Sequence, residues 1–258
     1  MNYETIRLSI RDGIAVLQLN RPEVMNALST QMRAEILHAV KAAEGEARVL
    51  VLTGKGKAFC SGQDLGDRAN MDDLNLERTL RDEYEPMLRA IFDCAVPTIA
   101  AVNGPAAGAG ANLALACDVV IATESAVFLQ AFTRIGLIPD AGGTYWLPRQ
   151  IGVARAMGAA LFAEAIPARK AVEWGMIWEA PADDAFAETW NERARHLARG
   201  PSVAYKAVKD AIRGSFDNDL DTQLSLEAQL QGRAGQTRDF KEGVMAFLEK
   251  RAAVFEGR

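Results

Sequence analysis

The sequence has few of the side chains that bind metals or form nucleophilic triads. It contains three cysteines, Cys60, Cys94 and Cys117, at irregular spacing, and no CxxC pair or cysteine/histidine cluster. A zinc site needs such clusters, so we expect no metal and three free thiols. The two histidines, His38 and His196, lie in helical patterns far from any candidate nucleophile. A histidine-based triad is therefore not expected.

A net positive charge, long apolar runs and nucleotide-binding motifs are also missing. The net charge is −5, which argues against a nucleic-acid partner. No stretch has the length of a membrane span, and the N-terminus lacks the pattern of a secretory signal, so we expect a cytoplasmic protein without membrane contact. Neither GxxxxGK[ST] nor a well-placed GxGxxG occurs. We therefore expect no nucleotide or redox cofactor.

What is present is the pattern of an α/β protein. The 258 residues are 49% hydrophobic, enough for a sizeable core. Apolar and β-branched runs alternate with helical periodicity through the first half, whereas the second half, from about Gly143, is nearly all helical. The predicted strands are 6–10, 14–19, 49–53, 58–60, 98–102, 119–122 and 176–178. The predicted helices of the first half are 29–43, 71–92 and 106–116, and those of the second half include 183–197, 202–213, 219–231 and 237–251.

Three glycine-bearing segments stand out, at 59–65, 103–112 and 136–144. Small residues let a backbone approach a ligand or another backbone closely. Strand-to-helix turns also leave N–H groups free at the start of a helix, and two such turns facing each other can stabilise an oxyanion. Close helix packing is the alternative explanation for each segment taken alone.

The whole chain resembles the enoyl-CoA hydratase/isomerase (crotonase) family. The segments that carry the resemblance, in family order, are Asn20–Leu28 (NRPEVMNAL), Ala58–Leu65 (AFCSGQDL), Pro97–Gly104 (PTIAAVNG), Cys117–Ala122 (CDVVIA), Gly136–Thr144 (GLIPDAGGT) and Gly243–Arg251 (GVMAFLEKR). The resemblance implies an α/β fold built as a crotonase-like spiral of ββα units with a helical C-terminal region. It divides the chain into a core, 1–198, and a trimerisation region, 199–258, and it implies a homotrimer or a dimer of trimers.

The resemblance also assigns chemistry to particular positions. The backbone N–H groups of Gln63 and Ala109 would form the oxyanion hole for a thioester. The two glutamates of the family's hydratases fall on Asn112 and Phe132, so both carboxylates are missing here. Asp140, where dienoyl-CoA isomerases of the family carry an aspartate, is the expected catalytic acid–base group. A helix N-cap is the alternative role for Asp140.

These features favour an isomerase acting on acyl-CoA. Within the family, the likeness is greatest to the epoxyphenylacetyl-CoA isomerases of phenylacetate breakdown, and 3-enoyl-CoA to 2-enoyl-CoA isomerisation uses the same groups. A hydratase, and a non-catalytic subunit that scaffolds a hydratase partner, are the alternatives. By motif, the substrate pocket would include Phe132, Asn112, Leu65 and Tyr145. Coenzyme A would contact Lys57, Asp64 and Lys250. The alternative for each lysine is a solvated surface charge with no ligand.

Overall fold

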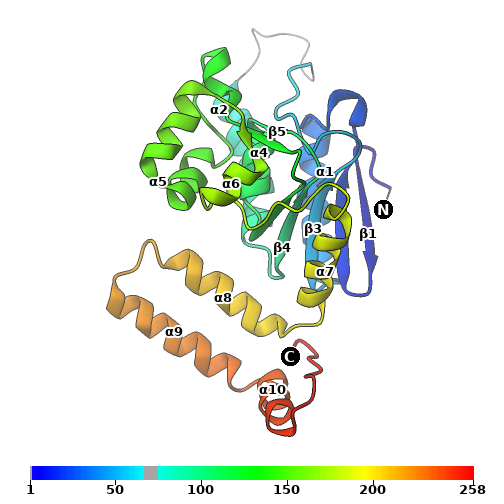
Figure 1. Cartoon of the computed structure of the whole chain (residues 1–258), viewed down its shortest axis with the longest axis vertical. Helices are drawn as coiled ribbons and strands as arrows, with labels where there is room; N and C mark the ends of the chain where they lie inside the picture. Colours follow the sequence, from blue (N-terminus) through cyan, green and yellow to red (C-terminus); the bar gives the residue numbers. More distant parts are fainter. Residues whose placement is uncertain (1, 67–74) are drawn as a thin grey trace.

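The computed structural model describes residues 2–66 and 75–258. Over these ranges the chain forms a layered α/β body from which a helical arm projects (Figure 1). None of the helices in the described ranges has the length and apolar character that crossing a bilayer requires. The same residues hold no group of three or more histidine, cysteine, aspartate or glutamate side chains that could share a metal ion.

The larger sheet has five strands in the order β1-β2-β3-β4-β6. These strands are β1 (Ile6–Arg11), β2 (Ile14–Leu19), β3 (Val49–Gly54), β4 (Thr98–Val102) and β6 (Val119–Ala122). The pair β1–β2 is antiparallel, and the remaining pairs are parallel. Asp12 and Gly13, with φ of 52° and 76°, form the left-handed two-residue turn of the hairpin between β1 and β2. The sequence prediction of these five strands is confirmed.

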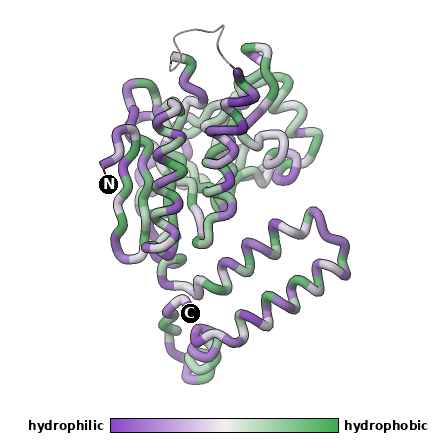
Figure 2. The backbone as a smooth tube through the Cα atoms, turned by 180° about the vertical axis from the view of Figure 1, so that it is seen from behind, coloured by the Kyte–Doolittle hydropathy of each residue, from purple (hydrophilic) through white to green (hydrophobic). Residues whose placement is uncertain are grey.

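Helices cover both faces of this sheet. Side chains alternate along each strand, so Leu50 and Leu52 of β3 pack toward α1 (Thr30–Glu44), while Val49 and Val51 pack with α7 (Phe186–Ala198) on the opposite face. Ser29 caps α1 by accepting a hydrogen bond from Met32 N at 3.2 Å. Figure 2 shows that hydrophobic residues concentrate in these strands.

A second sheet of three short strands adjoins the first, in the order β5-β7-β8. Its strands are β5 (Ala106–Ala107), β7 (Val127–Leu129) and β8 (Ile166–Pro167). The helix predicted from residue 106 therefore starts later, as α4 (Ala109–Leu115), because residues 106–107 pair with β7 and Gly108 has a φ of 52°. Helix α6 (Ala168–Glu173) packs against β7 and β8, and 3-10 turns form at Pro22–Val24 and Ala131–Ile135.

Two strand predictions are wrong, and one helix prediction is only partly covered. Residues 58–60 and 176–178 form no strand, since each region pairs through a single bridge, Cys60 with Ala106 and Ile121 with Glu179. The helix predicted over 71–92 lies partly outside the described residues. From residue 75 onward it consists of α2 (Leu76–Thr79), a π-helical turn (Leu80–Tyr84) and α3 (Glu85–Phe92).

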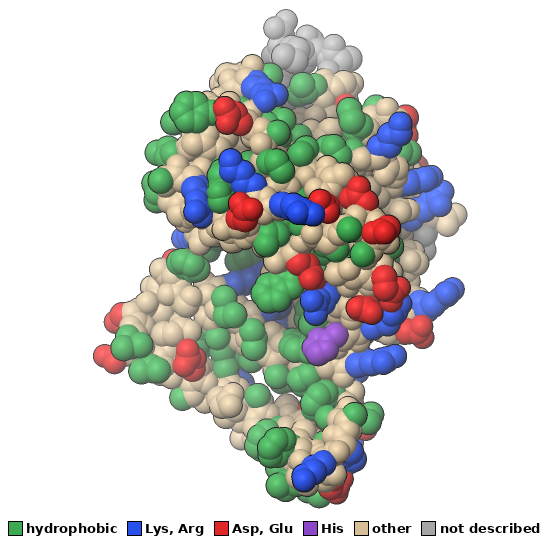
Figure 3. Space-filling model, viewed as in Figure 1, with side chains coloured by type: hydrophobic (Ala, Val, Ile, Leu, Met, Phe, Trp, Pro, Cys, Tyr) green, Lys and Arg blue, Asp and Glu red, His purple; other side chains and the backbone are tan. Residues whose placement is uncertain are grey.

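The second half is helical, as predicted. Its longest helix, α5 (Gly143–Phe162), is broken at Gly152, where φ is 76°. The arm consists of α8 (Ser202–Gly214), α9 (Leu220–Ala234) and α10 (Arg238–Glu249). It carries hydrophobic side chains on its surface (Figure 3), among them Phe216, Leu220 and Phe247, which are 61%, 72% and 82% exposed. The domain boundary at residue 198 and the role of the arm in trimerisation stay predictions.

Candidate active site

The backbone of residues 60–64 lies between two other segments of the chain. On one side, Leu28 N donates to Gly62 O at 2.8 Å, and Asp64 N donates to Leu28 O at 3.3 Å. On the other side, Ala107 N donates to Cys60 O at 2.9 Å. In a trans peptide the N–H points opposite to the C=O. The N–H of Gln63 therefore points away from Leu28, toward the side on which residues 107–109 lie.

Gly62 allows these segments to come together. Its φ of +96° is unfavourable for any residue with a Cβ atom. A Cβ built there would also lie 2.8 Å from Ala107 O and 3.4 Å from Ala109 N. The amides of Gln63 and Ala109 are thus brought to the same side of the loop by a close backbone approach that requires glycine.

The amide of Ala109 opens the first turn of α4. Gly108 O accepts from Asn112 N at 3.2 Å, so the N–H of Ala109, in the same trans peptide as that carbonyl, points out of the helix start. Within residues 2–66 and 75–258, neither the N–H of Gln63 nor that of Ala109 has a hydrogen-bond acceptor. Two free donors on one side of the loop can together stabilise a developing negative charge.

Asp140 lies in a tight turn before α5. Its backbone carbonyl accepts from Gly143 N at 2.8 Å, and the next two residues, Ala141 and Gly142, are left-handed, with φ of 49° and 82°. The Trp146 indole packs under the turn and donates to Ala141 O at 3.2 Å. The turn is therefore fixed by its own hydrogen bonds and by α5.

The carboxyl group of Asp140 has an environment suited to proton transfer. Its Oδ1 is buried and has no hydrogen-bond partner among the described residues. Burial penalises the charged form and raises the pKa of Asp140 from 3.8 to about 6, although a hydrogen bond from its own backbone opposes the shift. A carboxylate with such a pKa can accept and return a proton near neutral pH.

Asn112 joins Asp140 to the amide pair. Its side chain is fully buried, and its Nδ2 donates to Asp140 O at 2.7 Å while its Oδ1 accepts from Gln130 Nε2 at 2.9 Å. Asn112 stands three residues after Ala109, so both lie on one face of α4. This short helix thus presents one amide of the oxyanion pair and holds the backbone of the acid at the same time.

The side chain of Gln63 enters a polar network that the sequence did not predict. Its Oε1 accepts a short hydrogen bond from the Tyr84 hydroxyl and another from Arg33 Nη1 at 3.2 Å. Arg33 is completely buried and forms an ion pair with Glu83. In the sequence, the only indication that Arg33 is buried was its helical spacing, four residues before Leu37 and seven before Val40, on the buried face of α1.

The remaining predicted residues occupy different surroundings. Phe132, 7% exposed, lies against Gly108, since a Cβ built on that glycine would be 3.7 Å from its ring. Leu65 is 65% exposed and directly follows residues 60–64, the oxyanion loop. Tyr145 packs at 4.8 Å from Trp146 and lies 3.6 Å beneath the guanidinium of Arg149.

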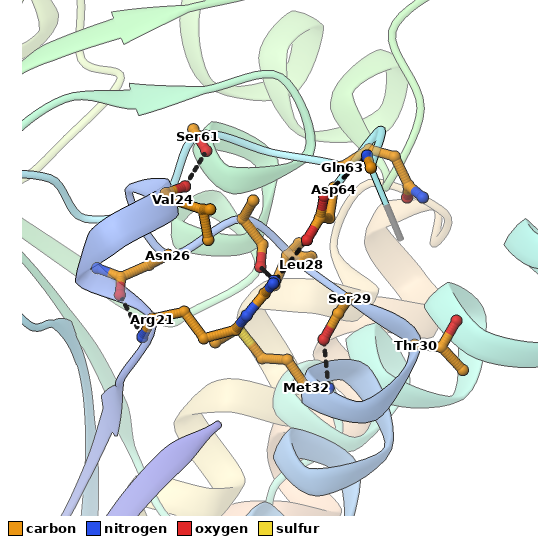
Figure 4. A network of polar contacts seen from close by, with 12 residues as sticks. Arg21, Val24, Asn26, Leu28, Ser29, Thr30, Met32, Ser61, Gln63 and Asp64 are labelled. Atoms are coloured by element: carbon orange, nitrogen blue, oxygen red, sulfur yellow. Dashed lines mark hydrogen bonds and ion pairs between the residues drawn. The ribbon is translucent and has the colours of Figure 1, made fainter. Parts of the chain in front are cut away.

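The predicted coenzyme A contacts are spread along the chain. Asp64 forms an ion pair with Arg21 at 2.6 Å and accepts from Gly66 N at 2.9 Å, and Figure 4 shows its carboxylate turned away from the side chain of Gln63. Although burial raises the pKa of Asp64, Arg21 and Gly66 N lower it below its usual value. Lys57 is exposed in the loop after β3, and Lys250 ends α10, far from α4 in this chain (Figure 1).

Comparison with known proteins shows the family of this chain. The sequence pattern of the family described as enoyl-CoA hydratase/isomerase matches residues 9–258. The chain belongs to the enoyl-CoA hydratase/isomerase family. A relative from Rhodobacter capsulatus, described as a probable enoyl-CoA hydratase, is 63% identical over the full length of both chains. The 1,2-epoxyphenylacetyl-CoA isomerase of Escherichia coli is 46% identical over 99% of both.

Solved structures confirm the fold expected of an enoyl-CoA hydratase/isomerase. The enoyl-CoA hydratase of Bacillus anthracis superposes with a TM-score of 0.91 at 34% identity, covering 99% of this chain and 100% of that one. The crotonase-like α/β architecture with a helical C-terminal region is therefore shown, as is membership of a family that acts on acyl-CoA. The two relatives carry the names of different reactions, so the reaction of this chain has to be argued from its own site.

Proposed function

We propose that this enoyl-CoA hydratase/isomerase family member is an acyl-CoA isomerase that uses Asp140 as its single acid–base group. The observation that carries the proposal is the buried Asp140 carboxyl, whose Oδ1 has no hydrogen-bond partner among the described residues and whose backbone is held by the same helix that presents the Ala109 amide. Such a pairing of one proton carrier with two amide donors suits proton transfer next to a thioester.

In the proposed reaction the thioester oxygen accepts hydrogen bonds from the N–H groups of Gln63 and Ala109. For a 3-enoyl-CoA substrate, the Asp140 carboxylate takes a proton from C2, and the C2–H electron pair moves into a dienolate whose charge rests on the thioester oxygen. The same carboxyl then delivers the proton to C4, leaving the double bond between C2 and C3. One amide donor contributes roughly 3 kcal/mol of transition-state stabilisation in such sites. Only a proton moves, so the mechanism uses no metal or redox cofactor.

A ring-fused epoxide of phenylacetyl-CoA is the second proposed substrate. The Escherichia coli relative named for that reaction supports it, at 46% identity over nearly the whole chain. The amide pair would again hold the thioester while the carbon–carbon bond shared by the six-membered ring and the epoxide breaks, which expands the ring to a seven-membered oxepin. Asp140 would take a proton from the carbon next to the thioester carbonyl and return it to a ring carbon. This places the chain in phenylacetate breakdown as a proposal.

Hydration of a double bond is the alternative, and the name of the Rhodobacter capsulatus relative favours it. Adding water requires a group that activates the water and one that delivers its proton to carbon. The positions that the family resemblance assigns to these groups hold Asn112, whose amide is engaged by Asp140 and Gln130, and the apolar Phe132. These contacts support isomerisation over hydration.

A product assay distinguishes the two reactions. The purified protein is incubated with 3-enoyl-CoA, crotonyl-CoA and the phenylacetyl-CoA epoxide, and the products are separated by mass and retention time. We expect double-bond migration and oxepin formation, with little gain of water by crotonyl-CoA. Hydration of crotonyl-CoA faster than any isomerisation would overturn the proposal. No turnover of any thioester would favour a scaffold for a hydratase partner.

Subunit assembly also belongs to the proposal. The exposed apolar side chains of α8–α10 are typical of a surface that another subunit covers, which supports a homotrimer or a dimer of trimers. In such an assembly Lys250 would approach the coenzyme A of a neighbouring subunit, while Lys57 and Asp64 would contact it within the same chain. Sedimentation of the purified protein measures the number of subunits directly.

A further inference from the structure

The far end of the Gln63 side chain is held by two hydrogen bonds. The carboxamide Oε1 accepts from both the Tyr84 hydroxyl and Arg33 Nη1, and these donors come from the π-helical turn and from α1. Tyr84 is 2% exposed and Arg33 is completely buried. The Arg33 guanidinium also lies 4.8 Å from the centre of the Tyr84 ring. The acceptor therefore sits between two donors that are themselves fixed by packing.

Arg33 also binds the backbone segment that holds residues 62–64. Its Nη1 donates to Leu28 O, the carbonyl that also accepts from Asp64 N. Its Nε donates to Glu83 Oε2 at 3.0 Å, next to Tyr84 in the π-helical turn. Leu28 thus binds the residues on both sides of Gln63, and Arg33 binds both Leu28 O and the end of the Gln63 side chain. Rotation of the Gly62–Gln63 peptide, which glycine would otherwise permit, is opposed at three points.

We infer that Tyr84 is a positioning residue, which holds the Gln63 carboxamide so that the Gln63 backbone N–H stays aimed at the thioester oxygen. The inference rests on the proposed oxyanion hole and extends it to a side chain with no direct contact to the reacting atoms. An oxyanion donor is effective only when it is fixed before the charge develops. A π-helical turn inserts one residue into a helix and is frequent near functional sites. Here it brings Glu83 and Tyr84 to the same network.

Tyr84 keeps its proton over the range in which the site works. Burial raises the pKa of Tyr84 above its ordinary value of 10, and although Arg33 lowers it, the negative charge of Asp140 raises it further. The hydroxyl therefore remains a donor to Gln63 whether Asp140 is charged or neutral.

The test uses a chromophoric thioester, dimethylaminocinnamoyl-CoA, whose absorption shifts to the red when its carbonyl is polarised. The full-length protein is titrated with this probe as wild type, Tyr84→Phe, Gln63→Met and the double variant. Tyr84→Phe keeps the ring, and Gln63→Met keeps the backbone amide and the side-chain length. Tyr3→Phe is the matched control, because it removes a phenol whose 2.8 Å hydrogen bond to the exposed His38, in the middle of α1, is not part of the Gln63 network.

We expect Tyr84→Phe to reduce the red shift and to lower kcat about 5- to 30-fold, the effect of losing one hydrogen bond of about 1–2 kcal/mol, with KM changed less than twofold. The double variant should lose no more than Gln63→Met alone, because Tyr84 acts through that carboxamide. Tyr3→Phe should match wild type. An unchanged red shift in Tyr84→Phe, or additive losses in the double variant, would overturn this inference alone. No red shift in the wild type would overturn the oxyanion hole as well.

Discussion

The side chain of Asn112 donates a hydrogen bond to the backbone carbonyl of Asp140, with 2.7 Å between Nδ2 and the oxygen. This contact joins α4 to the turn before α5 and so sets the position of the acid relative to the Ala109 amide. A glutamate at this position, as the resemblance gives for hydratases, would place a second carboxyl in the site. In this chain the position serves to hold the first one.

Replacing Asn112 with leucine tests this role. The two side chains are similar in volume, but leucine cannot donate to Asp140 O or accept from Gln130. Because the partners are buried, we expect the free energy of unfolding to fall by about 1–3 kcal/mol. We also expect kcat to fall roughly tenfold or more, because the turn that carries Asp140 is released. Urea unfolding and steady-state kinetics measure the two effects, and an unchanged kcat in a folded variant would show that Asn112 does not position the acid.

The pKa of Asp140 predicts the acid limb of the pH–rate profile. Since burial raises this pKa to about 6, the carboxylate that accepts the proton is lost as the pH falls below that value. We expect kcat for 3-enoyl-CoA isomerisation to be level above about pH 7 and to fall about tenfold per pH unit well below 6. A midpoint near 4, the ordinary range of an aspartate, would contradict the burial of this group.

The same shift predicts that the acid lowers stability at neutral pH. A carboxyl whose pKa is 3.8 when unfolded and about 6 when folded binds its proton more tightly in the folded state. The folded state therefore loses stability as the pH rises from about 4 through 6. We expect Asp140→Asn, which cannot ionise, to be more stable than wild type by about 1–3 kcal/mol at pH 8 and by little at pH 4.

Thermal unfolding of both proteins across this pH range measures the difference. Asp184→Asn, at an exposed carboxylate outside the site, serves as the control and should follow wild type. A stability gain of Asp140→Asn that did not depend on pH would assign the effect to packing rather than to charge.

Two glycines give a matched pair for the oxyanion loop. At Gly62, alanine would meet Ala107 O at 2.8 Å and would carry a φ of +96°, so the loop must move and displace the Gln63 amide. We expect Gly62→Ala to lower kcat at least about 100-fold, as for loss of an oxyanion donor. Gly45 has a φ of −83°, and a Cβ added to it would meet no atom within 4 Å, so it should accept alanine within roughly 0.5 kcal/mol and at full activity. Equal activity of the two variants would contradict the placement of the loop.

The sequence predicted those parts of the fold and site that depend on local pattern. The five strands of the larger sheet and helix α1 followed from apolar runs and helical periodicity. Strands β5, β7 and β8 were missed because two or three residues show no period. For the same reason, the helix predicted from residue 106 was placed too early.

The candidate site shows more clearly what a single sequence cannot predict. The family motifs pointed to Gln63, Ala109 and Asp140, but the hydrogen bonds that orient them cross long stretches of chain. Tyr84 meets Gln63 over 21 residues, and only a π-helical turn, which leaves no pattern in a single sequence, directs it there. The family resemblance gave Gln63 a role through its backbone N–H alone, whereas the structure also shows its side chain bound to two buried donors.

The most direct test of the account is the turnover of Asp140→Asn on 3-enoyl-CoA, with thioester binding measured in parallel. Asparagine keeps the shape of the turn and cannot carry the proton. We predict that kcat falls about 100- to 10,000-fold while the Kd for the thioester changes little, because the Gln63 and Ala109 amides remain. A folded Asp140→Asn protein with kcat within twofold of wild type would contradict the assignment of Asp140 as the acid–base group.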